Sequence, residues 1–243
     1  MKKILVTGGS GRFGSVLKKF KTNHKMIFPS KKELNILDLN SIKSYLKKKK
    51  PNILIHLAGL SRPMEEHEKN IQKSIDLNII GTANIVKGCA DNKIKLIYFS
   101  TNYVYPGKKG NYSETDPLNP VNNYAWSKLG GEASVRLFKN SLILRTCMTE
   151  KPFIHKKAFK NVKTNFIFHE KIIPILFKIL NKKGIINLGG KRQSVYDFAR
   201  ETNPKVKKIY LNDFTKRIVP KDSSMNLKKL KNILKRFGQG KNE

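Results

Sequence analysis

Acidic residues are scarce in this chain compared with basic ones. Its 243 residues include 17 Asp and Glu against 50 Lys and Arg, a formal net charge of +33. A balance this basic raises nucleic acid as a partner. The lysines are spread along the chain, however, and no RRM, KH or zinc-finger pattern accompanies them. We therefore expect no specific nucleic-acid binding, and we expect the positive charge to attract anionic ligands.

Cysteine and long apolar runs are also scarce. Cys89 and Cys147 share no C-x-x-C spacing and lie in or beside apolar runs, so we interpret them as reduced thiols. No apolar run approaches the roughly 18 residues of a membrane span, and the opening MKKILVTGGS has too few apolar residues for a signal peptide. The 5 histidines share no metal-ligand spacing. We expect a cytoplasmic protein with no membrane segment and no metal.

The pattern of apolar residues predicts the fold class. Short apolar runs alternate with longer amphipathic stretches from the first residue, which is typical of an α/β, doubly wound, Rossmann-like fold with a parallel sheet. The predicted helices lie near residues 12–20, 41–49, 68–91 and 123–139. The predicted strands are Lys3–Thr7, Lys25–Phe28, Asn52–Ala58, Lys95–Ser100 and Ser141–Thr146.

The alternation weakens after Thr149. Residues 172–180 look helical apart from Pro174, and residues 184–190, GIINLGG, look like one further strand. Two more helices are predicted, one opened by a capping-box variant and one basic and amphipathic, at residues 194–201 and 227–237.

The change of rhythm divides the chain. We expect a dinucleotide-binding domain over residues 1–149 and a small substrate-binding region over residues 150–243. The second region would also return a strand and a helix, at about residues 184–201, to the core. In a sheet of this kind, ligands bind beyond the carboxyl ends of the strands.

A glycine-rich loop, TGGSGRFG, follows the first predicted strand and precedes a helix. Its glycines fit two registers, which start at Gly8 or at Gly9 and share Gly11 and Gly14. In either register the glycines turn the chain tightly and let backbone N–H groups approach a pyrophosphate. The loop predicts dinucleotide binding by Gly8, Ser10, Gly11, Arg12, Phe13 and Gly14.

The end of the second strand bears on the choice of dinucleotide. An acidic residue there binds the ribose hydroxyls of NAD, whereas a cation favours the 2′-phosphate of NADP. Ser30 and Lys31 precede the first acidic residue, Glu33. The order favours NADP and leaves NAD as the alternative.

Three tyrosines are followed by a lysine four positions later, the spacing that puts both side chains on one face of a helix. Proline and glycine follow Tyr105 directly and oppose a helix there. Tyr45 belongs to a crossover helix whose outer side should face solvent. Tyr124 lies near the start of the helix before the fifth strand, and helices of this fold start at the ligand side of the sheet.

The pair of Tyr124 and Lys128 predicts acid–base chemistry. A lysine ammonium beside the phenol would stabilise the phenolate and lower the tyrosine pKa from its usual value of about 10. Tyr124 is then a candidate general acid for a carbonyl undergoing reduction. Ser100 and Thr101 offer hydroxyls at the end of the fourth strand, where a third group is expected.

With these residues assembled, the chain resembles the extended short-chain dehydrogenase/reductase superfamily and, within it, the dTDP-4-dehydrorhamnose reductase group. The resemblance covers about residues 1–147 and resumes at KGIINLGGKRQSVYDFARE. STNYVY matches a Ser-Thr-Asp-Tyr-Val-Phe stretch at the end of the fourth strand, and ETDPLNPVNNYAWSKLGGE matches the segment with the catalytic Tyr and Lys. HLAGLS matches a loop along the cofactor, and Asn78 matches a buried helix asparagine.

The resemblance implies NADPH-dependent reduction of a 4-keto group on a nucleotide-linked deoxysugar, a nucleotide-diphosphate sugar as substrate, and pairing into a homodimer. It implies catalytic roles for Thr101, Tyr124 and Lys128. Besides the loop residues above, it implies cofactor contacts from Ser30, Lys31, Asn35, Ile36, Leu57, Ala58, Gly59, Asn78, Ser100, Tyr124 and Lys128.

The chain departs from the group at several positions. Asn102 and Asn35 stand where the group usually has aspartates, TCMTEKPF after Arg145 lacks the usual aromatic-rich substrate loop, and the C-terminal region is short. These departures keep two alternatives open: a catalytically idle NADP-binding regulatory subunit, and a nucleotide-sugar epimerase or dehydratase. Dehydratases usually carry an Asp-Glu pair after the fourth-strand threonine, and Asn102-Tyr103 provides neither residue.

Overall fold

The computed structural model of the protein describes residues 1–212 and 219–239. The chain forms two compact units, each assembled from segments that are distant in sequence. Unit 1 consists of Met1–Ser100, Trp126–Leu144 and Lys182–Gly184. Unit 2 consists of Thr101–Ala125, Arg145–Asn181 and Ile185–Glu243. The division predicted at residue 149 stays a prediction.

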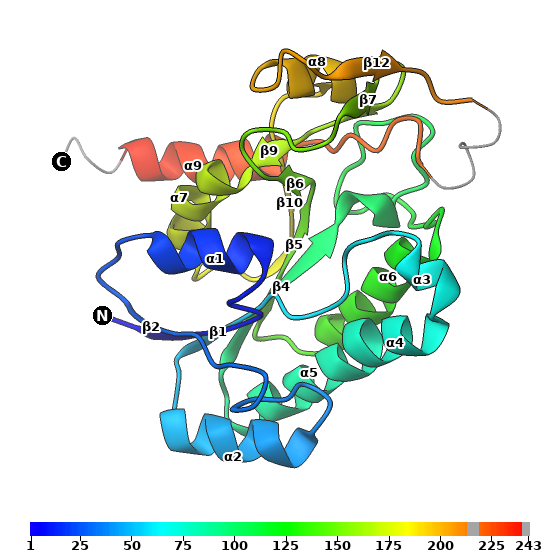
Figure 1. The fold of residues 1–243 in the computed structure, drawn as a ribbon. Coiled ribbons are helices and arrows are strands. Elements are labelled where there is room, and N and C mark those ends of the chain that lie inside the picture. The colour runs from blue at the N-terminus through cyan, green and yellow to red at the C-terminus, as the bar shows by residue number, and fades with distance from the viewer. Residues whose placement is uncertain (213–218, 240–243) are drawn as a thin grey trace. The chain divides into compact units, whose positions relative to one another are not determined.

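The central sheet has six strands: β1 (Lys3–Thr7), β2 (Lys25–Ile27), β3 (Ile53–His56), β4 (Lys95–Thr101), β5 (Ser141–Thr146) and β10 (Gly184–Leu188). Their order is β10-β5-β4-β3-β1-β2, and the sheet is parallel (Figure 1). Strands β3, β4 and β5 are buried along their whole length, as a sheet covered on both faces requires. The predicted doubly wound α/β fold is confirmed.

Seven helical segments accompany this sheet: α1 (Arg12–Lys19), α2 (Leu39–Lys49), α3 (Glu66–Lys69), α4 (Ile71–Ile75), the π-helix η1 (Asp76–Ile80), α5 (Gly81–Asp91) and α6 (Asn123–Arg136). Within unit 1, α1 lies on one side of β1, and α2 and α5 lie on the other (Figure 1). Helix α2 begins where the Asp38 carboxylate accepts hydrogen bonds from two backbone N–H groups, and ends in three lysines that suit the helix dipole.

The helix predicted over residues 68–91 is interrupted. Asn70 has non-helical φ and ψ, and its side chain accepts a hydrogen bond from the backbone N–H of Lys73, so it caps a new helix instead of continuing the old one. The π-helix follows and contains Asn78. A π turn shifts the helical register by one residue, and such turns are frequent at functional sites.

Unit 2 contains mostly short elements. A 3-10 turn, η2 (Asn102–Val104), directly follows β4. Three two-stranded sheets pair β11 with β8, β12 with β7 and β6 with β9. The elements are β6 (Met148–Thr149), β7 (Lys157–Phe159), β8 (Lys163–Thr164), β9 (Ile167–Phe168), α7 (His169–Ile179), β11 (Gln193–Ser194), α8 (Val195–Arg200), β12 (Lys207–Ile209) and α9 (Lys228–Gln239).

The strand predicted near residue 184 is found as β10, and it joins the central sheet beside β5. The helix predicted after it is found as α8 (Val195–Arg200). Its Phe198 joins a cluster with Phe153 and Phe168 whose rings lie 6.5 and 4.6 Å from that of Phe198. Aromatic contacts within unit 2 therefore place α8.

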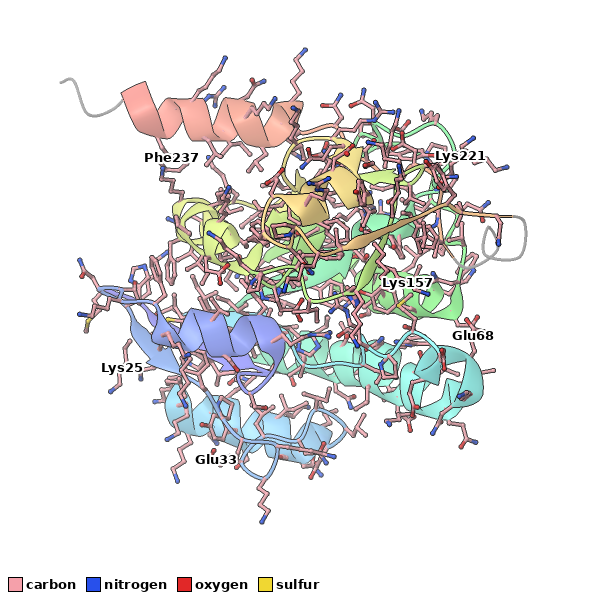
Figure 2. The ribbon with its side chains drawn as sticks, turned by 45° about the horizontal axis from the view of Figure 1, so that its top comes forward. Lys25, Glu33, Glu68, Lys157, Lys221 and Phe237 are labelled. Carbon is pink, nitrogen blue, oxygen red and sulfur yellow. The ribbon has the colours of Figure 1, made fainter. Side chains whose placement is uncertain are left out.

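Basic side chains project from the surface of both units, as Lys25, Lys157 and Lys221 illustrate (Figure 2). Among the helices in the described residues, none combines the length and the apolar character needed to cross a membrane.

Candidate active site

The glycine loop between β1 and α1 has one register that the backbone enforces. Gly8 has φ +71°, and a Cβ there would lie 2.6 Å from the backbone nitrogen of Ala58. A Cβ at Gly9 would meet only the flexible side chain of Phe28. Gly14 packs directly on the backbone of Gly8 and Gly9. The structure therefore supports the register of Gly8, Gly11 and Gly14.

The residues after Gly8 split between surface and core. Ser10, Gly11 and Arg12 are exposed, and Gly11 is the N-cap of α1 without a side-chain hydrogen bond, so the N-terminal end of this helix suits an anion. The Phe13 ring is buried and lies 5.2 Å from the ring of Phe99. The side chain of Phe13 is therefore part of the core.

The end of β2 leads into a turn closed by a reciprocal cap. The backbone N–H and the Oγ of Ser30 both donate to Oε2 of Glu33 at 2.8 Å, and the N–H of Glu33 donates to Ser30 Oγ at 3.3 Å. These hydrogen bonds hold the pKa of the Glu33 carboxyl below its usual value. Lys31, within this turn, is exposed.

The adenine-side candidates follow that turn. Asn35 is half-buried, and its Oδ1 accepts a hydrogen bond from the N–H of Leu37 at 3.2 Å. Ile36 is buried, and its carbonyl accepts from Asn84 Nδ2 at 3.1 Å. Its side chain packs so closely on Gly81 that a Cβ there would lie 2.7 Å from Ile36 Cδ1. This segment is thereby anchored on α5.

The loop after β3 is clamped by Asn78. Its Oδ1 accepts from the N–H of Leu60 at 2.7 Å, and its Nδ2 donates to the Leu60 carbonyl and to Ser127 Oγ, each at 2.8 Å. Leu57 and Ala58 border Gly8, and a Cβ at Gly59 would lie 2.6 Å from Asn78 Oδ1. Asn78 thus fixes the predicted cofactor loop against α6, beside the predicted lysine.

Helix α6 carries the Tyr124 and Lys128 pair on consecutive turns. The buried side chain of Asn122 starts the helix by accepting a hydrogen bond from the N–H of Ala125 at 2.9 Å. Tyr124 and Lys128 are each half-buried. Four residues of an α-helix separate them, so the phenol and the amine leave one face of the helix.

Lys128 is held against β4. Its Nζ lies 4.2 Å from the centre of the Tyr98 ring, and the Tyr98 hydroxyl donates to the Lys128 carbonyl at 3.1 Å. Burial lowers the pKa of Lys128 to about 7, and the negative charge of Glu132 one turn further on opposes that shift.

Glu132 is a site residue that the sequence prediction missed. It is fully buried, and its Oε2 accepts a hydrogen bond from Ser100 Oγ at 2.7 Å. The hydroxyl of Ser100 is therefore committed to a carboxylate, and Thr101 is left as the hydroxyl for a substrate. The signal was available: Glu132 stands four residues after Lys128, on the same helix face.

Thr101 ends β4 and belongs, with Tyr124, to unit 2. Its Oγ1 accepts from the N–H of Tyr103 at 3.2 Å and donates to Asn102 Oδ1 at 3.4 Å. The Tyr103 ring lies edge-on to the Tyr124 ring with 6.5 Å between their centres. Tyr103, two residues after Thr101, thus contacts the predicted general acid Tyr124.

The other two tyrosines followed by a lysine lie in different surroundings. Tyr105 is fully buried; its hydroxyl donates to Asn187 Oδ1 and accepts from Arg145, each at 2.8 Å. Burial raises its pKa, and the positive charge of Arg145 opposes that shift. Tyr45 lies on α2 with the Lys49 amine 5.6 Å from its ring centre.

All the predicted cofactor-binding residues except Tyr124 belong to unit 1, as does Lys128, whereas Thr101 and Tyr124 belong to unit 2. Across residues 1–212 and 219–239, no three His, Cys, Asp or Glu side chains are grouped so that they could hold a metal ion. The predicted roles of the site residues stay predictions.

Known proteins resemble the chain in sequence. A family model described as the RmlD substrate binding domain matches residues 1–159. Methionine adenosyltransferase 2 subunit beta of Danio rerio is 32% identical over 143 residues, which are 55% of this chain and 43% of that protein. The dTDP-D-glucose 4,6-dehydratase of Dictyostelium discoideum is 33% identical over 237 residues, 81% of this chain and 52% of that protein. The chain spans about half the length of these curated relatives.

A solved structure resembles the whole chain in fold. The dTDP-4-dehydrorhamnose reductase of Bacillus anthracis, solved in complex with NADP, superposes with a TM-score of 0.86 at 20% identity, and the match covers 100% of both chains.

Proposed function

Because this chain belongs to the RmlD substrate-binding domain family, within the extended short-chain dehydrogenase/reductase superfamily, we propose that it is an NAD(P)-dependent oxidoreductase. Its reaction would be reduction of the 4-keto group of a nucleotide-linked deoxysugar. The observation that carries the proposal is the pair on α6, where Tyr124 stands one turn before a lysine held against Tyr98.

The residues present fit a dinucleotide. Gly8 leaves the space that the neighbouring backbone of Ala58 requires, and α1 begins directly after the glycine loop, where the positive end of a helix dipole suits a pyrophosphate. The loop of Leu57, Ala58 and Gly59 adjoins Gly8 and is held by Asn78. A bound nicotinamide would supply the hydride for the reduction.

The chain's own groups would handle the proton and the developing negative charge. Tyr124 would donate a proton to the keto oxygen, because the Lys128 ammonium one turn away favours the phenolate that remains. Thr101 would donate a hydrogen bond to the same oxygen, because a keto oxygen can only accept one. Asn102 adds no charge beside it.

NADP is the proposed cofactor, with NAD as the alternative. Ser30 and Lys31 follow β2, where a 2′-phosphate would be bound. The reductase that resembles this fold was solved with NADP. Glu33 works against this preference, because its carboxylate already holds both donors of Ser30. The cofactor preference therefore depends on Ser30 and Lys31, which favour NADP, and on Glu33, which opposes it.

We place substrate binding in residues 150–243. A nucleotide-diphosphate sugar carries negative charge, and a protein of formal net charge +33 attracts such a ligand. A homodimer is also proposed, because α4, η1 and α6 expose large apolar side chains: Ile71 is 56%, Ile75 40%, Ile80 44% and Trp126 52% exposed. Cys89 and Cys147 are buried and form no disulfide, which suits a reducing compartment such as the cytoplasm.

A second candidate is a non-catalytic NADP-binding subunit. The relative from Danio rerio is named as a subunit of methionine adenosyltransferase, and it matches 55% of this chain. A third is a nucleotide-sugar dehydratase or epimerase, favoured by the dehydratase relative that aligns with 81% of the chain. Asn102 and Tyr103 weigh against a dehydratase, because neither supplies the carboxyl group of the usual Asp-Glu pair.

The proposal is tested by following NADPH and NADH oxidation with a panel of dTDP-, UDP- and GDP-linked 4-keto-6-deoxysugars. We expect turnover with at least one sugar, faster with NADPH. Tight NADPH binding without turnover on any sugar would overturn the reductase. The subunit candidate would then be tested by size-exclusion chromatography with a methionine adenosyltransferase catalytic chain.

A further inference from the structure

Asn102 uses its amide nitrogen entirely within unit 2. The residue is 2% exposed. Its Nδ2 lies 2.7 Å from Ser223 Oγ, 3.2 Å from the Ser223 carbonyl oxygen and 3.1 Å from Thr164 Oγ1. The carbonyl can only accept a hydrogen bond, so this contact requires a donor at position 102.

The amide oxygen of Asn102 faces the candidate catalytic hydroxyl. Thr101 Oγ1 donates to Asn102 Oδ1 across 3.4 Å, which is long for a hydroxyl hydrogen bond. The N–H of Tyr103 meanwhile donates to Thr101 Oγ1. The Thr101 hydroxyl thus donates only a weak hydrogen bond to Asn102. A substrate carbonyl at normal hydrogen-bond distance would replace Asn102 as its acceptor.

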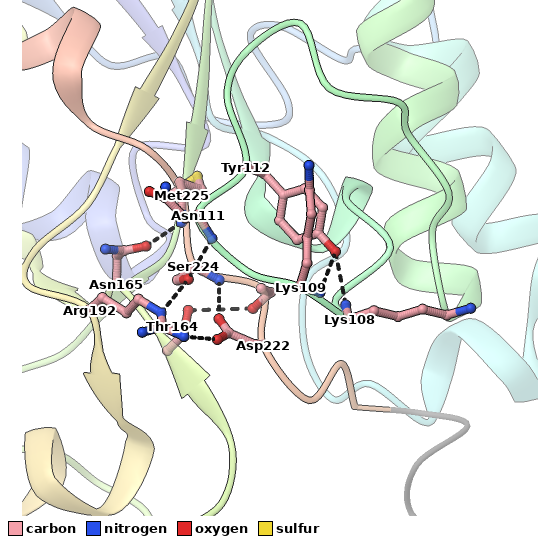
Figure 3. A network of polar contacts seen from close by, with 11 residues as sticks. Lys108, Lys109, Asn111, Tyr112, Thr164, Asn165, Arg192, Asp222, Ser224 and Met225 are labelled. Atoms are coloured by element: carbon pink, nitrogen blue, oxygen red, sulfur yellow. Dashed lines mark hydrogen bonds and ion pairs between the residues drawn. The ribbon is translucent and has the colours of Figure 1, made fainter.

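The segment of residues 221–226 that supplies Ser223 is firmly fixed (Figure 3). Asp222 accepts a charged hydrogen bond from Arg192, and its own N–H donates to the Gly107 carbonyl at 2.8 Å. Ser224 Oγ accepts from Arg192 Nε at 3.0 Å and from the N–H of Asn111 at 2.9 Å. Ser223 is therefore a rigid anchor for the Asn102 amide.

We infer that Asn102 is a positioning residue that couples the 221–226 segment to the Thr101 hydroxyl, and that turnover depends on this coupling. The inference rests on the proposed function. The asparagine is required here because an aspartate at position 102 would set a carboxylate oxygen against the Ser223 carbonyl, where neither can donate. The carboxylate usual at this position in the reductase group is thus incompatible with the anchor that this chain uses.

The test compares two Asn→Asp variants. Asn165 is the matched control, because it is also 2% exposed and also binds the 221–226 segment, through the N–H of Met225. Its Nδ2 donates to the Gly190 carbonyl at 3.0 Å, so Asn165→Asp loses a similar bond without touching Thr101. Both variants should unfold at lower urea concentration than the wild type.

Relative to Asn165→Asp, Asn102→Asp should lose about tenfold or more in kcat, the equivalent of one buried hydrogen bond of about 1.4 kcal/mol. Its KM for NADPH should be unchanged. Wild-type kcat in Asn102→Asp, or an equal loss in both variants, would overturn the inference.

A second measurement separates this inference from the proposed function. The side-chain amide resonance of Asn102 should shift in Ser223→Ala and in Thr101→Val, and should stay in place in Asn165→Asp. This readout needs no substrate, so it applies even if the wild-type protein reduces no sugar or if Asn102→Asp fails to fold. An Asn102 resonance that is unchanged in both Ser223→Ala and Thr101→Val would show that no coupling exists.

Discussion

Unit 1 and unit 2 hold their site residues by different means. In unit 1, the glycine loop is set by steric fit: a Cβ at Gly8 would lie 2.6 Å from the backbone of Ala58. In unit 2, Asn102 is set by hydrogen bonds to Ser223, a residue 121 positions away in sequence. Steric fit admits only glycine and so leaves a sequence signature, whereas a polar network can be built from many residue pairs and leaves none.

The largest expected effect comes from a substitution at Gly8, which tests the steric fit of unit 1. Gly8→Ala should reduce the free energy of unfolding by roughly 3 kcal/mol and weaken NADPH binding, because a left-handed φ and a backbone collision add together. Gly184 is the control, with φ +81° and nothing within 4 Å of a Cβ. Gly184→Ala should cost only about 1 kcal/mol. Equal losses in urea unfolding would contradict the steric explanation.

Asn78 tests whether unit 1 also depends on a polar clamp. Asn78→Ala removes hydrogen bonds to both backbone groups of Leu60 and to Ser127, and should cost roughly 2 kcal/mol. Asn84→Ala removes one bond, to the Ile36 carbonyl, and should cost about 1 kcal/mol. Urea unfolding of both variants measures the difference, and a smaller loss for Asn78→Ala would argue against the clamp.

The charge of Lys128 predicts a pH dependence. With its pKa lowered to about 7, the ammonium is lost as pH rises through that value, so kcat/KM of the free enzyme should decline above about pH 7. Glu132→Gln removes the carboxylate that opposes the shift, and the decline should begin at lower pH. A Gln side chain still accepts from Ser100, which keeps the geometry. An unchanged pH profile would exclude Glu132 from tuning Lys128.

The smallest expected effect concerns cofactor choice. Glu33→Gln removes an exposed negative charge beside Ser30, so the KM for NADPH should fall a few-fold and the KM for NADH should hardly change. Glu65→Gln is the control, because it also removes an exposed negative charge, at the N-cap of α3. A parallel change with both cofactors, or in both variants, would show that Glu33 does not select between them.

The fold and half of the site were predictable from sequence, for identifiable reasons. Buried parallel strands read as apolar runs, and the β1 to α1 loop reads as glycines with a strand before and a helix after. The helix break at Asn70 was not predicted. Capping by an asparagine side chain competes there with helix continuation, inside an apolar pattern that looks helical throughout.

Other features could not be seen in the sequence. Ser223 and Asn102 are distant in sequence, so no local spacing predicts their hydrogen bond. Phe198 packs α8 into an aromatic cluster whose members are also distant in sequence. The Ser100 and Glu132 contact joins a strand to a helix 32 positions later. Only the lysine-to-glutamate spacing on α6 hinted at it.

The central claim is that Tyr124 gives its proton to the substrate. It is tested most directly by kcat for NADPH oxidation in Tyr124→Phe and in the control Tyr45→Phe, with NADPH binding measured in both. We predict that Tyr124→Phe binds NADPH normally and loses at least about 100-fold in kcat, and that Tyr45→Phe matches the wild type. Full kcat in Tyr124→Phe would contradict the account.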